Sequence, residues 1–425
     1  MNLWQIAWGY LWNRKLTTTL TILSVALAVG LISAVLTLRQ EVDRRFAEEG
    51  QAFDLVVGAE GRGALELVLS CVYFIAAPYE TIPYSEYERI KADTDFVQNA
   101  FPLTMGDNYL GYRIVGTDPA LFDHKWVSTY SGEERRPFTL AEGRRFEKSM
   151  EAVVGAMAAR KTGLKVGDTF IGDHGLIELP DEMADLKHSE HPYTVVGILE
   201  PSNSPFDRVI YTDTASTWSV HEHFVDEYEV VSAEHSGEEH TDEPRLTAVL
   251  VQLHTALDRD TYEKILQDRP NILAAIPVRI VAKFFSQFIE PLKMVLMSVG
   301  FLVVIISALS ILIGLYMAII QRKRDLAIMR ALGASAAEIF GAVIIEAFWV
   351  TVLGIVFGWA LGRFATYAVG LLLAEQYGFV ISAIGISQAE IRAFASVALV
   401  GLLAGILPAW QAYDSDVAHD LADRQ

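Results

Sequence analysis

The feature that most constrains this chain is an apolar run of 23 residues without a charge, Leu16–Leu38, close to its start. A bilayer core of about 30 Å takes about 20 helical residues to cross. The run is also longer than the apolar core of about 7–15 residues of a cleavable signal peptide. Three further apolar stretches lie at 291–320, 339–373 and 391–411, and Pro408 is expected to end the last one. The sequence therefore predicts four membrane-spanning helices, the first at 16–38.

A long polar block separates the first span from the other three. Residues 39–290 hold 24 basic and 44 acidic side chains, whereas the rest of the chain holds 10 and 9. Alternating short runs and turn residues in the block are typical of mixed α/β structure. Strands are expected at Tyr112–Gly116, Ala152–Val154, Tyr193–Leu199, Arg208–Tyr211 and Leu246–Gln252, and helices at Tyr84–Lys91, Met157–Thr162 and Asp260–Leu266. The predicted fold class is a membrane α-helical protein in a 1 + 3 arrangement, with a large α/β extracytoplasmic domain between the first and second spans.

The short segments set the predicted orientation, because Lys and Arg favour the cytoplasmic side. Arg14 and Lys15 precede the first span, four basic residues lie in the loop 321–338, and the loop 374–390 has none. Both termini, including the tail 412–425, are therefore expected in the cytoplasm. Trp4, Trp8 and Trp12 form a stripe on a helix within residues 1–15, which suits the cytoplasmic membrane interface. Packing of this stripe on the protein's own spans is an equally good alternative.

Two features inside the spans concern helix packing. Small residues four apart let helices approach closely in lipid, and the chain has two such sets: Gly354, Gly358 and Gly362 in the third span, and Gly401 and Gly405 in the fourth. Packing within the fold is favoured, with a dimer interface as the alternative. Glu346 and Arg363 lie 17 residues apart, about 25 Å along a helix, so they cannot pair with each other. Glu346 must face protein or a cavity, and Arg363 is expected to reach the outer interface.

The chain shows few signs of chemistry of its own. It has no phosphate-binding G-x-x-x-x-G-K-[ST] motif and no hydrolase nucleophile motif, so no catalytic residue is predicted. The net charge of −19 argues against nucleic acid as a partner. An acidic stretch, His221–Pro244, holds His221, His223, His235 and His240. Zinc suits imidazole with carboxylate, and a solvated, exposed loop is the simpler interpretation.

Three stretches together resemble a known family. They are Asn13–Leu23 at the entry to the first span, Gln321–Ser335 after the second span, and Val153–Asp168 followed by Tyr193–Leu199 in the polar block. With the 1 + 3 arrangement, they resemble the permeases of the MacB/FtsX/Lol group of ABC transporters. The tail Ala412–Ala418 lacks the Asp-Pro-Val ending that is usual in this group.

The resemblance implies a permease of the bacterial inner membrane that works as a homodimer with two separately encoded ATPases. These partner subunits bind and hydrolyse ATP, and the permease passes their movement to extracytoplasmic events. Gln321–Ser335 is then a short amphipathic coupling helix in membrane lipid head groups, ended by Gly333, with Met329 and Leu332 expected to face the ATPase. Its predicted contact residues are Arg322, Lys323, Arg324, Asp325, Ile328, Met329, Arg330, Leu332 and Gly333. A periplasmic adaptor or substrate-binding protein is a further expected partner. The alternatives are a zinc transport component and a membrane regulator of a cell-wall enzyme.

Overall fold

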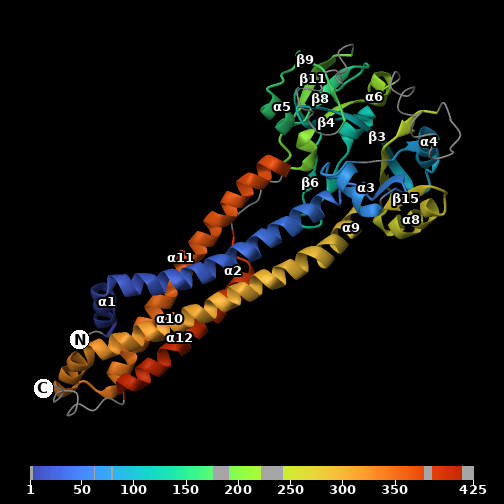
Figure 1. The fold of residues 1–425 in the computed structure, drawn as a ribbon. Helices are drawn as coiled ribbons and strands as arrows, with labels where there is room; N and C mark the ends of the chain where they lie inside the picture. Colours follow the sequence, from blue (N-terminus) through green and yellow to red (C-terminus); the bar gives the residue numbers. More distant parts are fainter. Residues whose placement is uncertain are drawn as a thin grey trace, which may run out of the picture. The chain divides into compact units, whose positions relative to one another are not determined.

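The structure is a computed structural model that describes residues 3–61, 63–77, 80–175, 191–221, 243–377 and 385–413. The chain divides into two compact units (Figure 1). The helical unit comprises Met1–Val42, Phe288–Leu372 and Ile381–Gln425. The α/β unit comprises Asp43–Gln287 with Leu373–Val380.

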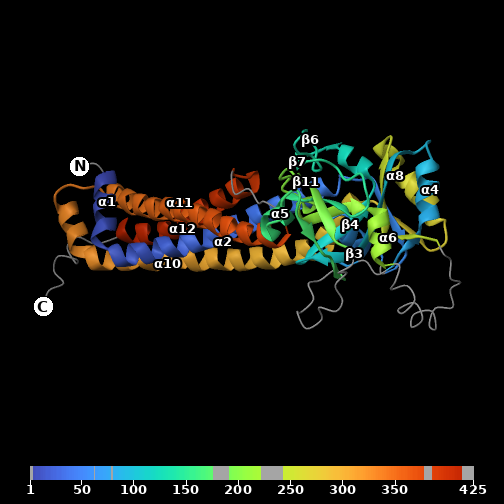
Figure 2. The same cartoon turned by 90° about the horizontal axis from the view of Figure 1, so that it is seen from above.

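Four long helices form the helical unit, and Figure 2 shows them side by side. They are α2 (Lys15–Glu49), α10 (Glu290–Ala331), α11 (Ala336–Tyr377) and α12 (Gln388–Tyr413), preceded by the short α1 (Leu3–Asn13). Each predicted span lies within one of these helices. Among the described residues, these four helices are long and apolar enough to cross a membrane.

The helices differ from the predicted spans in two places. The coupling segment, Gln321–Ser335, is not a separate short helix, because α10 continues without a break through Ala331. Nothing in Gln321–Ala331 stops a helix, since the first glycine is Gly333. Pro408 does not end the fourth span either, and α12 continues through it to Tyr413. A proline removes only one backbone donor, and membrane helices tolerate that loss where neighbouring groups compensate for it.

The turn between α10 and α11 is tightly specified at both ends. Gly333 has a φ of +104°, which suits glycine, and the amide of Ala334 donates to the carbonyl of Met329 at 3.0 Å. Ser335 then caps α11. Its amide donates to the carboxylate of Glu338 at 2.8 Å, and the amide of Glu338 donates to the Ser335 hydroxyl at 3.3 Å. The predicted stop at Gly333 therefore lies between two long helices.

The predicted glycines lie where the helices are closest. A methyl group at Gly354 would lie 2.5 Å from Cβ of Val25 on α2, and one at Gly358 would lie 2.6 Å from Cβ of Val29. Gly362 faces the backbone of Gly30 in the same way. On α12, Gly401 faces Thr351 and Gly405 faces Ala347, both on α11. All five glycines thus contact helices of the same chain.

The tryptophan stripe on α1 also contacts the helical unit. Trp4 meets Phe348 edge-on at 5.9 Å between ring centroids, and Trp8 meets Trp349 at 5.2 Å, both on α11. Trp12 is exposed, with the Lys15 ammonium 5.0 Å from its ring centroid. Two of the three tryptophans therefore follow the second interpretation, packing on the protein's own spans.

The α/β unit is built on one large mixed sheet. The strand order is β15-β1-β14-β3-β4-β12-β8-β11-β7, with β10 paired to β3 and β9 to β11. These strands are β1 (Leu55–Ala59), β3 (Val97–Tyr109), β4 (Tyr112–Thr117), β7 (Leu140–Gly143), β8 (Glu151–Val154), β9 (Thr169–Phe170), β10 (Asp173–His174), β11 (Tyr193–Leu199), β12 (Val209–Asp213), β14 (Ala248–Leu253) and β15 (Ile272–Ala275). Two small pairs join β2 (Ile82–Pro83) to β13 (Arg245–Leu246), and β5 (Trp126–Val127) to β6 (Glu134–Arg135).

Short helices surround this sheet. They are α3 (Ala64–Cys71), α4 (Tyr84–Ala92), α5 (Ala156–Thr162), α6 (Thr214–His221), α8 (Arg259–Gln267) and α9 (Pro277–Phe284), with 3-10 turns η1 (Pro119–Asp123), η3 (Pro205–Arg208) and η4 (Ala256–Asp258) and the π-helical turn η5 (Phe285–Ile289). The predicted strands and helices fall on these elements with small shifts at their ends. The one predicted strand Leu246–Gln252 is divided at Thr247, whose hydroxyl accepts from the amide of Met105 at 2.9 Å.

One histidine of the α/β unit belongs to its core. His124 is buried, stacks on Phe53 with 4.5 Å between ring centroids, and hydrogen-bonds the carbonyl of Ala52 at 2.5 Å through Nε2. Burial lowers the pKa of His124 from its usual value. Because desolvation disfavours the charged imidazolium, this histidine is neutral in the folded protein.

Candidate functional site

The coupling segment presents two different faces. Arg322, Leu326 and Met329 follow the i, i+4, i+7 spacing and lie on one side of α10, where Leu326 is buried. Ile328 and Leu332 lie four residues apart on another side and are 41% and 83% exposed. Large apolar side chains with this exposure are available to a partner. The exposed apolar face of the segment is therefore Ile328 with Leu332.

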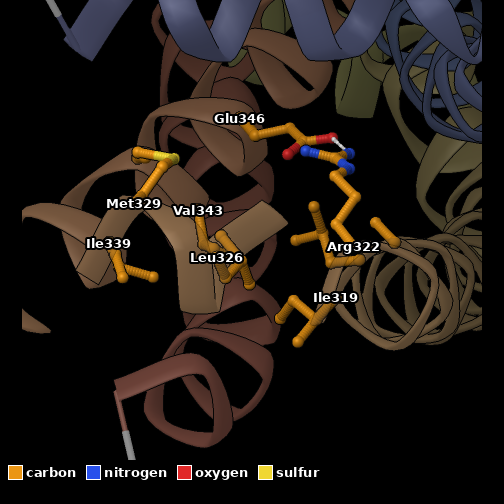
Figure 3. Close-up of a pocket in the computed structure, with 10 residues that line it drawn as sticks. Ile319, Arg322, Leu326, Met329, Ile339, Val343 and Glu346 are labelled. Carbon is orange, nitrogen blue, oxygen red and sulfur yellow. Dashed lines mark hydrogen bonds and ion pairs between the residues drawn. The ribbon is translucent and has the colours of Figure 1, made fainter. Parts of the chain in front are cut away.

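The inward side of the segment lines a pocket between α10 and α11 (Figure 3). The lining residues are Leu315, Ala318, Ile319, Arg322, Leu326 and Met329 of α10, and Ile339, Ala342, Val343 and Glu346 of α11. Met329 points into this pocket together with Ile339. Of the two residues predicted to face the ATPase, Met329 is half-buried and lines this pocket, whereas Leu332 is exposed. Their contact with an ATPase stays a prediction.

The pocket is polar at one end. Nη2 of Arg322 donates to the Glu346 carboxylate at 3.2 Å, and both side chains are largely buried (Figure 3). One residue earlier on α10, Gln321 accepts a hydrogen bond from the guanidinium of Arg14, which lies between α1 and α2. Glu346 thus faces protein, as predicted, and its partner comes from another helix.

The other predicted contact residues surround the exposed face. Lys323 and Asp325 are exposed, and Arg330 is half-buried. The side chain of Arg324 lies outside the part of the chain that the structure describes. The end of α10 therefore places Ile328 and Leu332 among charged neighbours. Such an arrangement can bind an apolar groove with a charged rim.

Arg363, further along α11, is paired with Glu390. Its guanidinium donates to both oxygens of Glu390 at 2.8 and 3.0 Å, and Glu390 is 1% exposed. The hydroxyls of Ser33 and Thr37 on α2 donate to the same carboxylate at 2.7 and 3.2 Å. A buried charge needs such partners. The expectation that Arg363 reaches the outer interface stays a prediction.

Sequence reasoning missed Glu390, although a signal for it exists. Ser387-x-x-Glu390 is a capping motif, and the amide of Ser387 donates to Glu390 at 2.9 Å while the amide of Glu390 donates to Ser387 at 3.1 Å. The motif marks the first turn of α12. It therefore indicates a carboxylate at the start of a span, close enough to the membrane to need a cation.

The proposed metal ligands are mostly outside the described residues. His223, His235 and His240 lie in 222–242, and His221 ends α6 with its side chain likewise outside the description. Within the described parts of the chain, no group of three or more His, Cys, Asp or Glu side chains could hold a metal ion. The zinc hypothesis therefore stays a prediction.

Comparison with known proteins identifies the family. The family model of the MacB-like periplasmic core domain matches residues 16–269, and that of the FtsX-like permease C-terminal region matches residues 297–417. The chain belongs to the MacB/FtsX family of ABC transporter permeases. Its membership and its four apolar helices make it a multi-pass membrane protein, and the resemblance stated from the sequence is confirmed.

Two relatives illustrate the similarity. The chain is 28% identical over 145 residues to the macrolide export ATP-binding/permease protein MacB of Escherichia coli, covering 32% of this chain and 22% of that protein. It is 23% identical over 237 residues to a protein of the same name from Shewanella sp. (strain W3-18-1), covering 54% of this chain and 34% of the relative. The matches therefore span about a third or less of the relatives' length.

Proposed function

We propose that this permease receives movement from an ATP-binding partner through Ile328 and Leu332 and passes it along α10 and α2. The observation that carries the proposal is the exposed pair of apolar residues at the end of a helix that runs unbroken from Glu290 to Ala331. A helix of that length transmits displacement better than a jointed segment, because each turn is hydrogen-bonded to the next. No substrate channel through the bilayer is needed for this role.

The proposal includes the assembly and the orientation. The permease works as a homodimer, with ATP bound and hydrolysed by a partner ATPase rather than within residues 1–425. The absence of a phosphate-binding loop motif from this sequence supports this division of labour. Both termini and the turn at Gly333 lie in the cytoplasm of a bacterium, and the α/β unit lies outside the inner membrane.

The continuity of two helices supports the path of movement. The division between the two units falls inside α2, after Val42, inside the π-helical turn η5, after Gln287, and inside α11, after Leu372. At all three places the backbone stays helical, and α2 and η5 are the two connections that carry the main chain of the α/β unit. Single π-helical turns are frequent at functional sites. The proposed movement therefore passes through α2 on one side and η5 on the other.

The proposed contact with the ATP-binding partner, the docking face formed by Ile328 and Leu332, is tested with Ile328→Asp/Leu332→Asp in the full chain. The double variant should insert in the membrane and keep its thermal stability, but should lose co-purification of the ATP-binding subunit and vanadate-sensitive ATPase activity. Gln388→Asp, which adds one negative charge on the exposed first turn of α12, is the control for added charge and should keep both. An unchanged complex with unchanged ATPase activity in the double variant would exclude this docking face.

The orientation is tested with single cysteines at Ser131 and Ser335, both exposed, in a Cys71→Ala background. In intact spheroplasts, an impermeant maleimide should label the Ser131→Cys variant and leave Ser335→Cys unlabelled until the membrane is opened. Labelling of Ser335→Cys from outside would reverse the proposed orientation.

A further inference from the structure

We infer that Glu346 is the positioning residue of the docking face: by holding Arg322, its carboxylate fixes the rotation of α10 and therefore the direction in which Ile328 and Leu332 point. This inference rests on the proposed function, since the face that it positions is the proposed ATPase contact. Glu346 itself touches no part of that face.

Contact between two apolar stripes specifies the rotation of α10 weakly. On α10, Leu315, Ile319 and Leu326 face the pocket, and on α11 Ile339 and Val343 face them. In a membrane such contacts compete with lipid tails of the same polarity, so a helix that turns exchanges one apolar neighbour for another. A second kind of interaction is needed to select one rotation.

The Arg322–Glu346 pair supplies that interaction. Glu346 is 6% exposed and lies within a helix that is otherwise apolar around it. A carboxylate in this environment is costly unless it is paired, and among the described residues its hydrogen-bond partner is Arg322 at 3.2 Å. Fixing register is the best-attested use of a buried polar pair. Turning α10 would separate the two charges.

A second contact holds the same turn of α10 from another side. Gln321 accepts from Arg14 at the junction of α1 and α2, while Arg322 donates to Glu346 on α11. Successive residues of a helix point about 100° apart, so the turn at 321–322 is held in two directions. The docking face begins six residues later, at Ile328. The direction in which the docking face points is therefore set by the turn at 321–322, which is hydrogen-bonded to two different parts of the helical unit.

The same pair should also decide how accessible the pocket beside it is. Met329 and Ile339 lie next to each other further along the pocket. Ile339 should stay covered as long as the two helices keep this rotation. Ile339 is 1% exposed, so a thiol at this position reports whether the end of α10 lies against α11.

The experiment measures the reaction of N-ethylmaleimide with Ile339→Cys in the full chain, in a Cys71→Ala background, in membranes without any ATPase. Labelling should be slow in this parent. With Glu346→Gln or Arg322→Gln it should accelerate roughly tenfold or more, because a local opening becomes more populated. The charge exchange Arg322→Glu/Glu346→Arg should restore slow labelling. Leu332→Cys, exposed throughout, should react rapidly in every background and serves as the standard.

The matched control is Thr37→Val, which removes hydrogen bonds at the other end of α11 and keeps the shape of the side chain. It should leave Ile339→Cys slow. Equal acceleration by Thr37→Val would mean general loosening and would overturn the inference, as would slow labelling in Glu346→Gln or rapid labelling in the charge exchange. Glu346→Asp keeps the charge and is used if Glu346→Gln does not insert in the membrane. Ile339→Cys should react more slowly in the Glu346→Asp background than in Arg322→Gln. Because no ATPase is present, failure of the proposed docking does not affect this result.

Discussion

Helix α11 carries two charged residues within its long apolar stretch, Glu346 and Arg363, and the helix holds these two charges differently. At the Arg363 end, each oxygen of Glu390 accepts at least two hydrogen bonds, from α2, α11 and the first turn of α12. At the Glu346 end, the carboxylate accepts from Arg322 at 3.2 Å beside a pocket. The first arrangement joins three helices firmly, and the second positions one helix end and leaves room for it to move.

The glycines of α11 extend the firmly joined end. Gly354, Gly358 and Gly362 lie against α2, and the backbones approach so closely that Gly358 faces both Val29 and the carbonyl of Ala26. Near the Glu346 end the facing residues are the larger side chains of α10. We therefore expect α2, α11 and α12 to be held together more firmly around Arg363 than the end of α10 is held at Glu346.

The largest expected effect separates the two ends directly. Glu390→Gln leaves the buried Arg363 without its counter-charge and should lower the free energy of unfolding by about 3–5 kcal/mol. Glu346→Gln keeps an oxygen that can accept from Arg322 and should cost about 1.5–3 kcal/mol, the range of one hydrogen bond to a charged group. Thermal unfolding in detergent, followed by tryptophan fluorescence, measures both. Equal losses would mean that the two ends are equally firm.

The next effect tests the glycine contacts. Gly358→Ala places a methyl group 2.6 Å from Cβ of Val29 and 2.7 Å from the carbonyl oxygen of Ala26, so the helices must separate. Overpacking of this kind costs about 1–3 kcal/mol. Gly314→Ala is the matched control, since its methyl group would meet Thr21 at an ordinary 3.4 Å, and it should be near neutral. If both variants unfold together at the parental temperature, the close contact of α2 and α11 does not hold.

A smaller effect depends on pH. It concerns the α/β unit and not the helical unit. The pKa of His124 is lowered in the folded protein and is about 6.5 when unfolded, so the unfolded state binds more protons at acidic pH. The stability that His124 contributes is thus fully present above pH 6.5. Below pH 6.5 this contribution falls by up to about 1.4 kcal/mol per pH unit, until the pH reaches the pKa of His124 in the folded protein. His124→Phe, which keeps the stacking on Phe53, should flatten this step in a pH series of unfolding temperatures; an unaltered step would assign it to other groups.

The smallest expected effect is on stability at the docking face. Leu332 is 83% exposed, so Leu332→Asp should change the free energy of unfolding by less than about 0.5 kcal/mol. Met329→Asp buries a charge in the pocket and should destabilise the fold much more. Unfolding temperatures of the two variants give the comparison. A large loss in Leu332→Asp would mean that this residue packs within the fold.

Much of the architecture could be predicted because it depends on local patterns. Leu16–Leu38 specified a span by length alone, and short alternating runs such as Tyr193–Leu199 specified strands of the sheet. The end of α10 at Gly333 followed from the backbone freedom of glycine. The extent of α10 could not be read from its polarity, since α10 continues through the change from apolar to basic residues at Gln321.

The sequence by itself determined which residues need partners, and only the tertiary structure decided which partners they have. Glu346 and Arg363 are charges in apolar helices, and that alone requires compensation. Their partners, Arg322 and Glu390, lie 24 and 27 residues away, and Ser33 and Thr37 reach Glu390 from 357 and 353 residues away. Such distances are bridged by the packing of α2, α10, α11 and α12. The same packing turns Met329 inward and Leu332 outward, because the side of α10 that faces α11 depends on the neighbouring helix and not on the spacing along its own.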